Sequence, residues 1–505
     1  MEWTNQHSCG GSEGEDPQKV NCNIIIQYMC DIEVTNDRAM SVGLRDGGNT
    51  NTPTEPNNYA DTADTNDQNT GRQESKGFYY ECKRRKRNQG LFLADQNLNG
   101  DTAEYTRQNP GGTRRGLECP EERDYYPYWY PSPWIDAAYL TDRTEDCDYF
   151  KAGSQNTATV YKCDGLVQQD QDTYITQTEC TNNGGNWVPY TKNLPAPECS
   201  QAPWGRTNHL GNAADGEPAN WTWTLPSYQT LDTYGATTYG NTYPSKRCVM
   251  RLRYNISTDD YDPWNTTVDD NEILENNPVV DVGASLQGLR LAINTNQFGR
   301  TFQDRSHTFY IVNRPAAFNG KTVTNLNVRG KRGNIVQTFP SVEYDFIPAR
   351  LSISTNDLIH VQWTGSNTHN NGGGGGDGQA GDDGQGNGGT DRNNFVAIND
   401  YASSFPIPLD KTEWDDINIV KKSTCYDLRG TTIADWVDCA VILATSGYAR
   451  TSTADFEDFD DQMNNAPASL IGGVVMSTSS GTYNYMSSRN NNFSNRGQKG
   501  WIHVE

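Results

Sequence analysis

The sequence has no long apolar run and a deficit of basic charge. No segment reaches the roughly 18 consecutive apolar residues that a membrane-spanning helix needs. Lys and Arg total 41 against 64 Asp and Glu, which gives a net charge of −23. Nucleic-acid phosphates and anionic membrane surfaces both select basic faces. The composition therefore predicts no membrane span, and it argues against nucleic acid and anionic membranes as partners.

Common catalytic and metal-binding motifs are also absent. No G-x-S-x-G, H-E-x-x-H or Cys/His nucleophile pattern occurs, and no pair of cysteines forms a C-x-x-C. With only six histidines, zinc sites are not expected, so disulfides in an oxidising compartment are the simplest use of the twelve cysteines. These are Cys9, Cys22, Cys30, Cys82, Cys119, Cys147, Cys163, Cys180, Cys199, Cys248, Cys425 and Cys439.

Sequons support the same secretory route. An Asn-rich chain contains a few N-x-[ST] matches by chance, so they add support without deciding the matter. The opening MEWTNQHSCGG has neither the basic segment nor the apolar core of a signal peptide, which predicts that Met1 is an internal or processed start. The predicted N-glycosylation sites are Asn220, Asn255, Asn265 and Asn492.

Short alternating and β-branched runs dominate the chain, with Gly, Pro, Asn and Asp between them. Asn23–Met29, Cys248–Tyr254 and His307–Val312 are typical of strands, and we expect the first two to pair. A short helix is predicted over Thr432–Ala444. Residues 31–245 are polar and cysteine-bearing without a long strand ladder, which predicts a loop-dominated insertion held by disulfides. Two further strands are expected over Leu289–Asn294 and Ile335–Phe339.

Two stretches near the C-terminus, Val342–Gly365 and Gly481–Val504, are typical of the opening and closing strands of a cupredoxin. In that fold the closing loop supplies a Cys, a His and usually a Met to a type-1 copper site, which needs two imidazoles and a thiolate. Here the last cysteine, Cys439, precedes the loop, so we predict a sandwich without copper ligands. The loop instead offers Met486, Ser487, Arg489, Asn490 and, near the axial position, Gln498.

One segment matches the front half of a calcium loop. Asp95, Asn97, Asn99 and Asp101 alternate as oxygen donors in the order that wraps a hard cation. The twelfth position, which should hold a bidentate Glu, is Thr106. The alternative is an Asx-rich turn that bonds its own backbone. Calcium therefore stays open as a ligand of this segment.

A dense aromatic cluster forms the other candidate site. Side chains of this type can stack on sugars or anchor a partner protein, and they can equally form the local core of an irregular insertion. Both interpretations stay open from the sequence. The residues concerned are Tyr125, Tyr126, Tyr128, Trp129 and Trp134.

Several longer strings are specific in combination. They are EWTNQH (Glu2–His7), NCNIIIQYMC (Asn21–Cys30), GLFLADQNL (Gly90–Leu98), ECPEERDYYPYW (Glu118–Trp129), RLRYNIST (Arg251–Thr258), NTNQFGRTFQDRSH (Asn294–His307), NVRGKRGNIVQTFP (Asn327–Pro340) and RNNNFSNRGQKG (Arg489–Gly500). Together they resemble the DD-three-three family of secreted, cysteine-rich eukaryotic proteins, over nearly the whole chain. The resemblance implies secretion and a cell-surface or matrix role, and it carries no catalytic residue.

The predicted fold is mainly β, with one immunoglobulin-like sandwich, one cupredoxin-like sandwich without metal ligands, and a long disulfide-rich irregular insertion. Residues 1–30 with 246–315 are expected to form the first sandwich. Residues 31–245 form the insertion, and residues 316–505 form the second sandwich. The second sandwich carries a Gly-rich loop at 370–389, which lacks the Lys and Ser/Thr of a phosphate loop.

Three functional hypotheses follow. The first is a secreted structural glycoprotein of the cell surface or extracellular matrix. In this hypothesis the protein self-associates and forms the repeating subunit of an extracellular filament. The second is a secreted carbohydrate-binding module, and the third is a copper oxidoreductase. The first is preferred, with no enzymatic activity, no cofactor and no catalytic residue expected.

Overall fold

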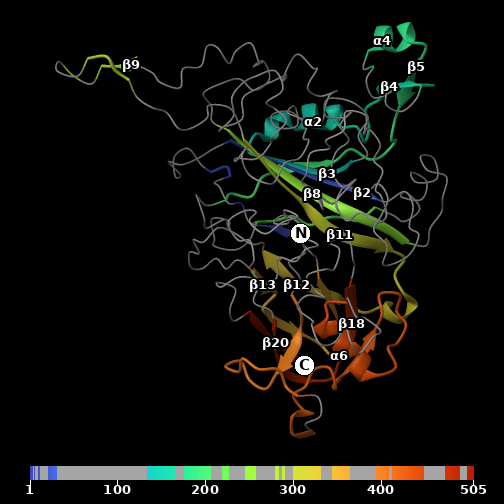
Figure 1. Ribbon diagram of the computed structural model, residues 1–505, viewed down its shortest axis with the longest axis vertical. Coiled ribbons are helices and arrows are strands. Elements are labelled where there is room, and N and C mark those ends of the chain that lie inside the picture. Colours follow the sequence, from blue (N-terminus) through green and yellow to red (C-terminus); the bar gives the residue numbers. More distant parts are fainter. Residues whose placement is uncertain are drawn as a thin grey trace, which may run out of the picture.

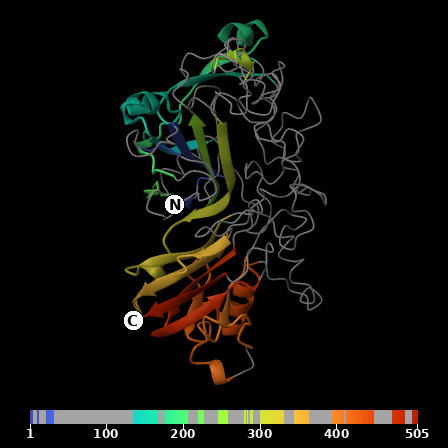
Figure 2. The same ribbon diagram turned by 90° about the vertical axis from the view of Figure 1, so that its left-hand side faces the viewer.

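The computed structural model places an N-terminal sheet above a two-sheet C-terminal sandwich (Figure 1), and the two follow one another along the long axis when the molecule is turned (Figure 2). The prediction of a mainly β protein is confirmed. Across the described parts of the chain, no helix is long and apolar enough to cross a membrane. The structure describes residues 1–3, 5, 9–11, 21–30, 134–166, 174, 176–205, 219–226, 245–257, 279–281, 283, 287–290, 300–330, 344–363, 393–408, 412–447, 472–488 and 498–505.

The N-terminal sheet has the strand order β11-β8-β2-β3-β6. Its centre is β2 (Asn21–Cys30), which pairs antiparallel with β8 (Ser245–Ser257), so the expected pairing of these two segments is confirmed. On the other side of β2 lies β3, antiparallel to it, and β6 lies parallel to β3 at the edge. The remaining strands are β3 (Ile135–Thr141), β6 (Glu198–Gln201) and β11 (Arg300–Val312).

Residues 31–245, expected to lack a long strand ladder, contribute the two short strands β3 and β6 to this sheet. Six of the seven residues of β3 are buried, so the strand is covered on both faces. Such a strand carries a continuous run of apolar or small residues instead of an alternation, which removes the signal that sequence analysis relies on. The division of the chain into domains stays a prediction, with these two strands added to the first sheet.

Both faces of the central strand are packed. Ile24 and Ile26 face Trp221, next to the short pair formed by β1 (Glu2–Trp3) and β7 (Ala219–Asn220). Ile25 points the other way, toward Tyr139 and toward Phe150 of α2 (Cys147–Gly153). The Tyr139 and Phe150 rings stack with centroids 3.8 Å apart. Burial on both faces explains the unbroken apolar run of β2.

Disulfides fasten these elements to one another. Ten of the twelve cysteines lie in described residues and form five disulfides, while Cys82 and Cys119 lie outside them. Cross-links of this kind restrict the unfolded chain and supplement small cores. The pairs are Cys9–Cys22, Cys30–Cys248, Cys147–Cys199, Cys163–Cys180 and Cys425–Cys439.

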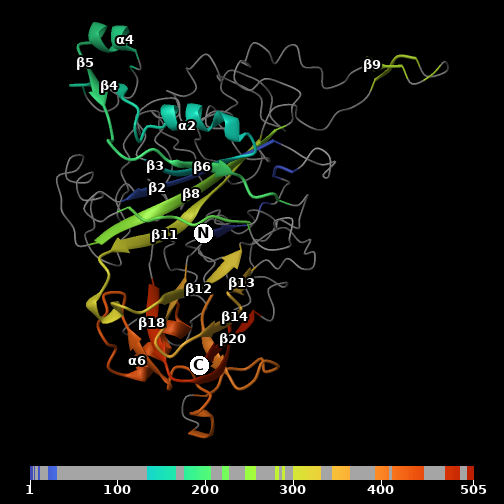
Figure 3. The ribbon, with the colours of Figure 1, turned by 180° about the vertical axis from the view of Figure 1, so that it is seen from behind.

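A small unit stands at the end of the molecule opposite the sandwich (Figures 1 and 3). It consists of the hairpin β4 (Val160–Asp164) and β5 (Asn186–Tyr190) with the short helix α4 (Gln177–Asn182). The Cys163–Cys180 disulfide joins α4 to β4, and a Cβ on Gly185 would lie only 2.4 Å from the Cys163 sulfur. The disulfide and the glycine beside it therefore take the place of a larger core.

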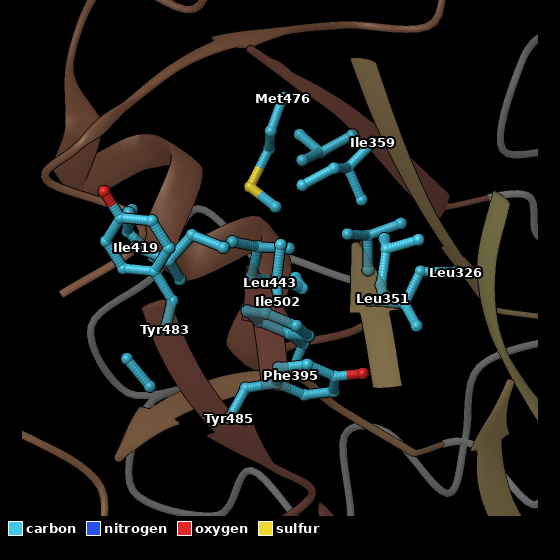
Figure 4. Packing of buried hydrophobic residues seen from close by; sticks show 14 of the residues in the cluster. Leu326, Leu351, Ile359, Phe395, Ile419, Leu443, Met476, Tyr483, Tyr485 and Ile502 are labelled. Atoms are coloured by element: carbon cyan, nitrogen blue, oxygen red, sulfur yellow. The ribbon is translucent and has the colours of Figure 1, made fainter. Parts of the chain in front are cut away.

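The C-terminal sandwich consists of a five-stranded sheet in the order β13-β12-β15-β18-β17 and a four-stranded sheet in the order β14-β20-β19-β16. The two predicted cupredoxin stretches form β13 to β15 and β19 to β20. Figure 4 shows Leu326 and Ile359 of the first sheet facing Ile502 and Tyr485 of the second. The bounds are β12 Val323–Gly330, β13 Tyr344–Ile347, β14 Arg350–Ile353, β15 Leu358–Trp363, β16 Val396–Ile398, β17 Ser423–Tyr426, β18 Gly472–Thr478, β19 Gly481–Met486 and β20 Lys499–Val504.

A helix closes one end of this sandwich. The predicted helix Thr432–Ala444 is α6 (Trp436–Ala444), and Asp435 caps it by accepting a 2.9 Å hydrogen bond from the Val437 amide. Cys439 and Leu443, one turn apart, are its buried residues. The other short elements are η3 (Thr144–Asp146), β9 (Val279–Val280), β10 (Leu289–Arg290), η5 (Ala316–Phe318) and η6 (Thr412–Trp414).

The connection between the two halves is packed against the sandwich. After β11 the chain passes through η5, where the buried Phe318 contacts Leu358 and Val475. The Arg314 guanidinium donates to the Phe318 carbonyl oxygen at 2.8 and 3.1 Å. These contacts fix the connection to the C-terminal sheet instead of leaving it a free linker.

Gly430 tests this attachment. A Cβ at Gly430 would lie 2.6 Å from the Pro315 Cβ, whereas a Cβ at Gly320 would meet nothing within 4 Å, and both glycines have positive φ. Both Ala variants therefore incur the left-handed backbone cost of about 1–2 kcal/mol. Only Gly430→Ala should lose about 1–3 kcal/mol more of the free energy of unfolding, because its Cβ overpacks the contact with Pro315. Urea unfolding of both variants measures the difference, and equal losses would show that the connection is not tightly held.

Candidate functional site

The closing end of the sandwich is where a cupredoxin would hold its metal. Three segments meet there: the residues before β16, the end of β19 and the start of β20. Asn393, Asn394, Ser487 and Gln498 are all buried, with exposed fractions of 3 to 6%. The Ser487 amide donates to the Gln498 carbonyl oxygen at 3.0 Å, which joins β19 to β20 across the closing loop.

Asn394 is the centre of a polar network at this end. Its Oδ1 accepts from the Ser488 amide at 2.8 Å and from the Ser487 hydroxyl at 3.3 Å. Its Nδ2 donates to the Ser488 hydroxyl at 2.7 Å and to the Ala444 carbonyl oxygen at 3.0 Å. One amide therefore ties β16, the closing loop and the C-terminus of α6 together.

These residues do not fit type-1 copper. The described side chains at the closing end are amides and hydroxyls, while the metal needs imidazole nitrogens and a thiolate. The two described histidines of the sandwich have other partners: His360 bonds Asn325 at 2.9 Å, and His503 bonds Thr482 at 2.8 Å. Within the described residues no group of three or more His, Cys, Asp or Glu side chains is placed to hold a metal.

His360 is neutral in the folded protein. An amide oxygen only accepts, so Nδ1 carries the proton that is donated to Asn325 Oδ1. Burial disfavours the imidazolium and lowers the pKa of His360 to about 4. His360 therefore stabilises the contact between β15 and β12 as a neutral side chain.

Gln498 differs from its neighbours because its buried side-chain amide has no hydrogen-bond partner at either atom among the described residues. Leaving a buried polar group unpaired costs about 1–3 kcal/mol. Gln498→Met should therefore raise the free energy of unfolding by roughly that amount, because the thioether fills a similar volume without polar atoms. Asn394→Leu is the control and should destabilise the sandwich. A loss of stability in Gln498→Met would contradict this account.

A second buried polar cluster lies on the N-terminal sheet. Gln27 of β2 donates to one carboxylate oxygen of Asp136 at 2.7 Å, and the Ser154 hydroxyl donates to the other at 2.6 Å. The Arg251 guanidinium of β8 donates from Nε to Gln27 Oε1 at 2.9 Å. Lys192 donates to the Trp134 carbonyl oxygen. All five side chains are at most 5% exposed, so the cluster is closed to a substrate.

Burial dominates the electrostatics of this cluster. It raises the pKa of Asp136 to about 6 despite the hydrogen bonds and the two nearby cations, and it lowers the pKa of Lys192 to about 8. Sequence analysis missed these residues. The one available signal is that Arg251 and Arg253 interrupt an otherwise apolar strand, CVMRLRY, whose neighbours bury both faces.

Asp136 should leave a pH signature on stability. Its folded pKa is raised above the ordinary value of 3.8, so the folded state binds more protons between pH 3.8 and 6. This contribution to stability is therefore present at low pH and lost as pH rises to about 6, by up to about 3 kcal/mol. Asp136→Asn should remove this falling contribution, so the difference in unfolding free energy between wild type and Asp136→Asn should change with pH in urea titrations from pH 4 to 7. The exposed control Asp148→Asn should give a profile parallel to that of the wild type. Parallel profiles for wild type and Asp136→Asn would refute the assignment.

The predicted aromatic site is only partly described. Trp134 is 1% exposed, and the Arg251 guanidinium lies 4.1 Å from its ring centroid. That position favours the packing interpretation for Trp134. The other members, Tyr125, Tyr126, Tyr128 and Trp129, lie outside the described residues.

Two of the remaining predicted site residues, Asn220 and Asn255, lie in the described part of the chain. Asn220 is exposed on β7, and Asn255 lies on β8 between Asn23 and Thr301 of the neighbouring strands. The residues that lie outside the described ones are the calcium candidates Asp95, Asn97, Asn99 and Asp101, the sequon residues Asn265 and Asn492, the closing-loop residues Arg489 and Asn490, and the Gly-rich loop 370–389.

The fold and these sites define a disulfide-stapled β protein whose C-terminal half is cupredoxin-like and whose described closing-end residues are not copper ligands. The family model described as the DD3-3 N-terminal domain matches residues 1–274 and 267–311, and the DD3-3 cupredoxin-like domain matches residues 321–504. The chain therefore belongs to the DD3-3 family. No curated protein and no solved structure matched it.

Proposed function

We propose that this chain is a secreted structural glycoprotein of the cell surface or extracellular matrix, and the repeating subunit of an extracellular filament. Five disulfides fit an extracellular protein, because such bonds persist in oxidising compartments. The observation that carries the structural role is the closing end of the sandwich. There the amide–hydroxyl network around Asn394 cross-links three segments in the place where the fold elsewhere carries out redox chemistry.

The attached connection supports the same role. Phe318 packs the segment after β11 against the C-terminal sheet, and Arg314 holds the turn around Phe318 within that segment. Load that enters one half is then transmitted to the other through packed side chains instead of a slack linker. A subunit with such a connection can repeat with a constant geometry.

Strand β11 offers a route to self-association. It has 13 residues and is one of the two edge strands of the described sheet, paired with β8 on one side. An edge strand presents unpaired backbone donors and acceptors that another strand can fill. We infer that a strand of a second copy pairs with β11. The exposed Asn220 supports the glycoprotein assignment.

Assembly of the full secreted chain tests the proposal. Electron microscopy and analytical ultracentrifugation should show elongated assemblies, and a monodisperse monomer at high concentration would contradict it. Neighbouring residues of a strand direct their backbone N–H groups to opposite edges, so either Gln303 or Asp304 points its N–H away from β8. Proline removes that N–H, so one of the two variants Gln303→Pro and Asp304→Pro should abolish assembly without unfolding the chain. The other should weaken β11–β8 pairing and lower the melting temperature. If both fold and assemble as wild type does, β11 is not the contact.

Glycosylation is checked on the same material. Glycosidase treatment should lower the mass of the secreted chain. Thr222 is the third residue of the Asn220 sequon, so Thr222→Ala should remove the glycan at Asn220 while Thr222→Ser keeps it. A mass unaffected by Thr222→Ala would show that Asn220 carries no glycan.

A further inference from the structure

The β4–β5 hairpin carries an exposed aromatic pair on one face. Tyr161 is 50% exposed, and Trp187 is half-buried beside it. Tyr161 faces Pro189 across the hairpin and Trp187 faces Cys163, so the two rings are diagonal neighbours on the same face. Their centroids are 6.2 Å apart, and their planes differ by only 8°. The two rings are therefore stacked, and the half-exposed ring of Tyr161 is the more accessible member of the stack.

Hydroxyl groups adjoin this aromatic pair. Thr159 immediately precedes β4 and Thr191 immediately follows β5, so continuing the strand alternation by one residue places them beside Tyr161 and Pro189. The two threonine hydroxyls lie 3.0 Å apart, and their hydrogen bond is exposed to solvent. A flat apolar surface thus continues into a pair of groups that can both donate and accept.

The site is also held rigidly. The Cys163–Cys180 disulfide fixes α4 against the strand that carries Tyr161, and Gly185 leaves no room for a Cβ next to either sulfur. Thr176 caps α4 by accepting from the Glu179 amide at 3.2 Å. Little conformational freedom remains to be lost on binding, which favours affinity from a small contact. The unit also stands clear of the described body of the molecule (Figure 3).

The size and charge of the site select the ligand class. Two aromatic rings bury at most about 500 Å², below the roughly 800 Å² per partner of a stable protein interface. A sugar ring has the matching chemistry, because its C–H face is apolar and electropositive and its rim carries hydroxyls. An aromatic face is electron-rich and attracts such hydrogens. The net charge of −23 disfavours acidic glycans, which leaves neutral ones.

The geometry points to a binding site for a neutral pyranose unit of a glycan on the face formed by Tyr161, Trp187 and the Thr159–Thr191 hydroxyl pair. The sugar ring stacks on the aromatic pair, and its hydroxyls bond the threonines. Two sources supply this chemistry: a neutral matrix polysaccharide, or the neutral N-glycan of a second copy. The inference does not rest on filament formation, because binding to a free oligosaccharide and assembly of the chain are measured separately.

Isothermal titration of the full chain tests the site. Three probes are used: a neutral β-glucan oligosaccharide, a neutral oligomannose N-glycan and the acidic polysaccharide heparin. We expect binding by a neutral probe and none by heparin, and the two neutral probes distinguish the two sources. Tyr161→Ala and Trp187→Ala should each weaken binding about tenfold, Tyr161→Phe should retain it, and Thr159→Val should weaken it less.

Phe405→Ala is the matched control, because Phe405 is 81% exposed and lies in the C-terminal sandwich. It should bind as wild type does. Because Trp187 is partly packed, its variant is checked by circular dichroism, and Tyr161→Ala keeps the test independent if Trp187→Ala unfolds. The proposal is overturned if neither neutral probe binds, or if Tyr161→Ala binds as tightly as wild type.

Discussion

The pairing of β2 with β8 is the contact on which the N-terminal half depends. The Cys30–Cys248 disulfide lies at the end of this ladder and joins residues 218 positions apart. In the chain-entropy model, closing a loop of that length costs the unfolded chain about 5 kcal/mol, which the disulfide removes from the folding equilibrium. Once β2 and β8 are joined, β3 and β11 can add to them, and β6 can add to β3.

The two halves use polar groups inside the fold in different ways. In the C-terminal sandwich Asn394 joins its own segment to two others, and it acts as a neutral cross-link at the end where a metal would otherwise hold the loops. In the N-terminal sheet the cluster of Gln27, Asp136 and Arg251 is charged. Burying charge is costly unless every partner is in place, so this cluster restricts how β2, β3 and β8 can align.

The chain concentrates its accessible chemistry away from these interiors. The described amides at the closing end and the Asp136 cluster are buried, whereas the β4–β5 unit exposes aromatic rings on a disulfide-held hairpin. A protein with sealed cores and exposed contact surfaces is suited to holding other molecules together. The proposed roles in assembly and glycan binding both follow from this distribution.

The sequence by itself determined the class of the protein. Short β-branched and alternating runs located β2 and β8, and the strings around Val342–Gly365 and Gly481–Val504 located the cupredoxin-like strands. The position of Cys439 showed that the closing loop has no thiolate. Each of these signals is contained in a short segment, so no partner is needed to recognise it.

Apart from the β2–β8 pairing, only the tertiary structure decided which segments meet. Strand β3 is buried on both faces and therefore has no alternation to find, and Asp136, Arg251 and Gln27 are far apart in sequence. Tyr161 and Trp187 contact each other because the register of the β4–β5 hairpin places them on one face, and the Cys163–Cys180 disulfide holds that hairpin against α4. Register and burial are set by contacts across the whole chain, and those contacts leave no local mark in the sequence.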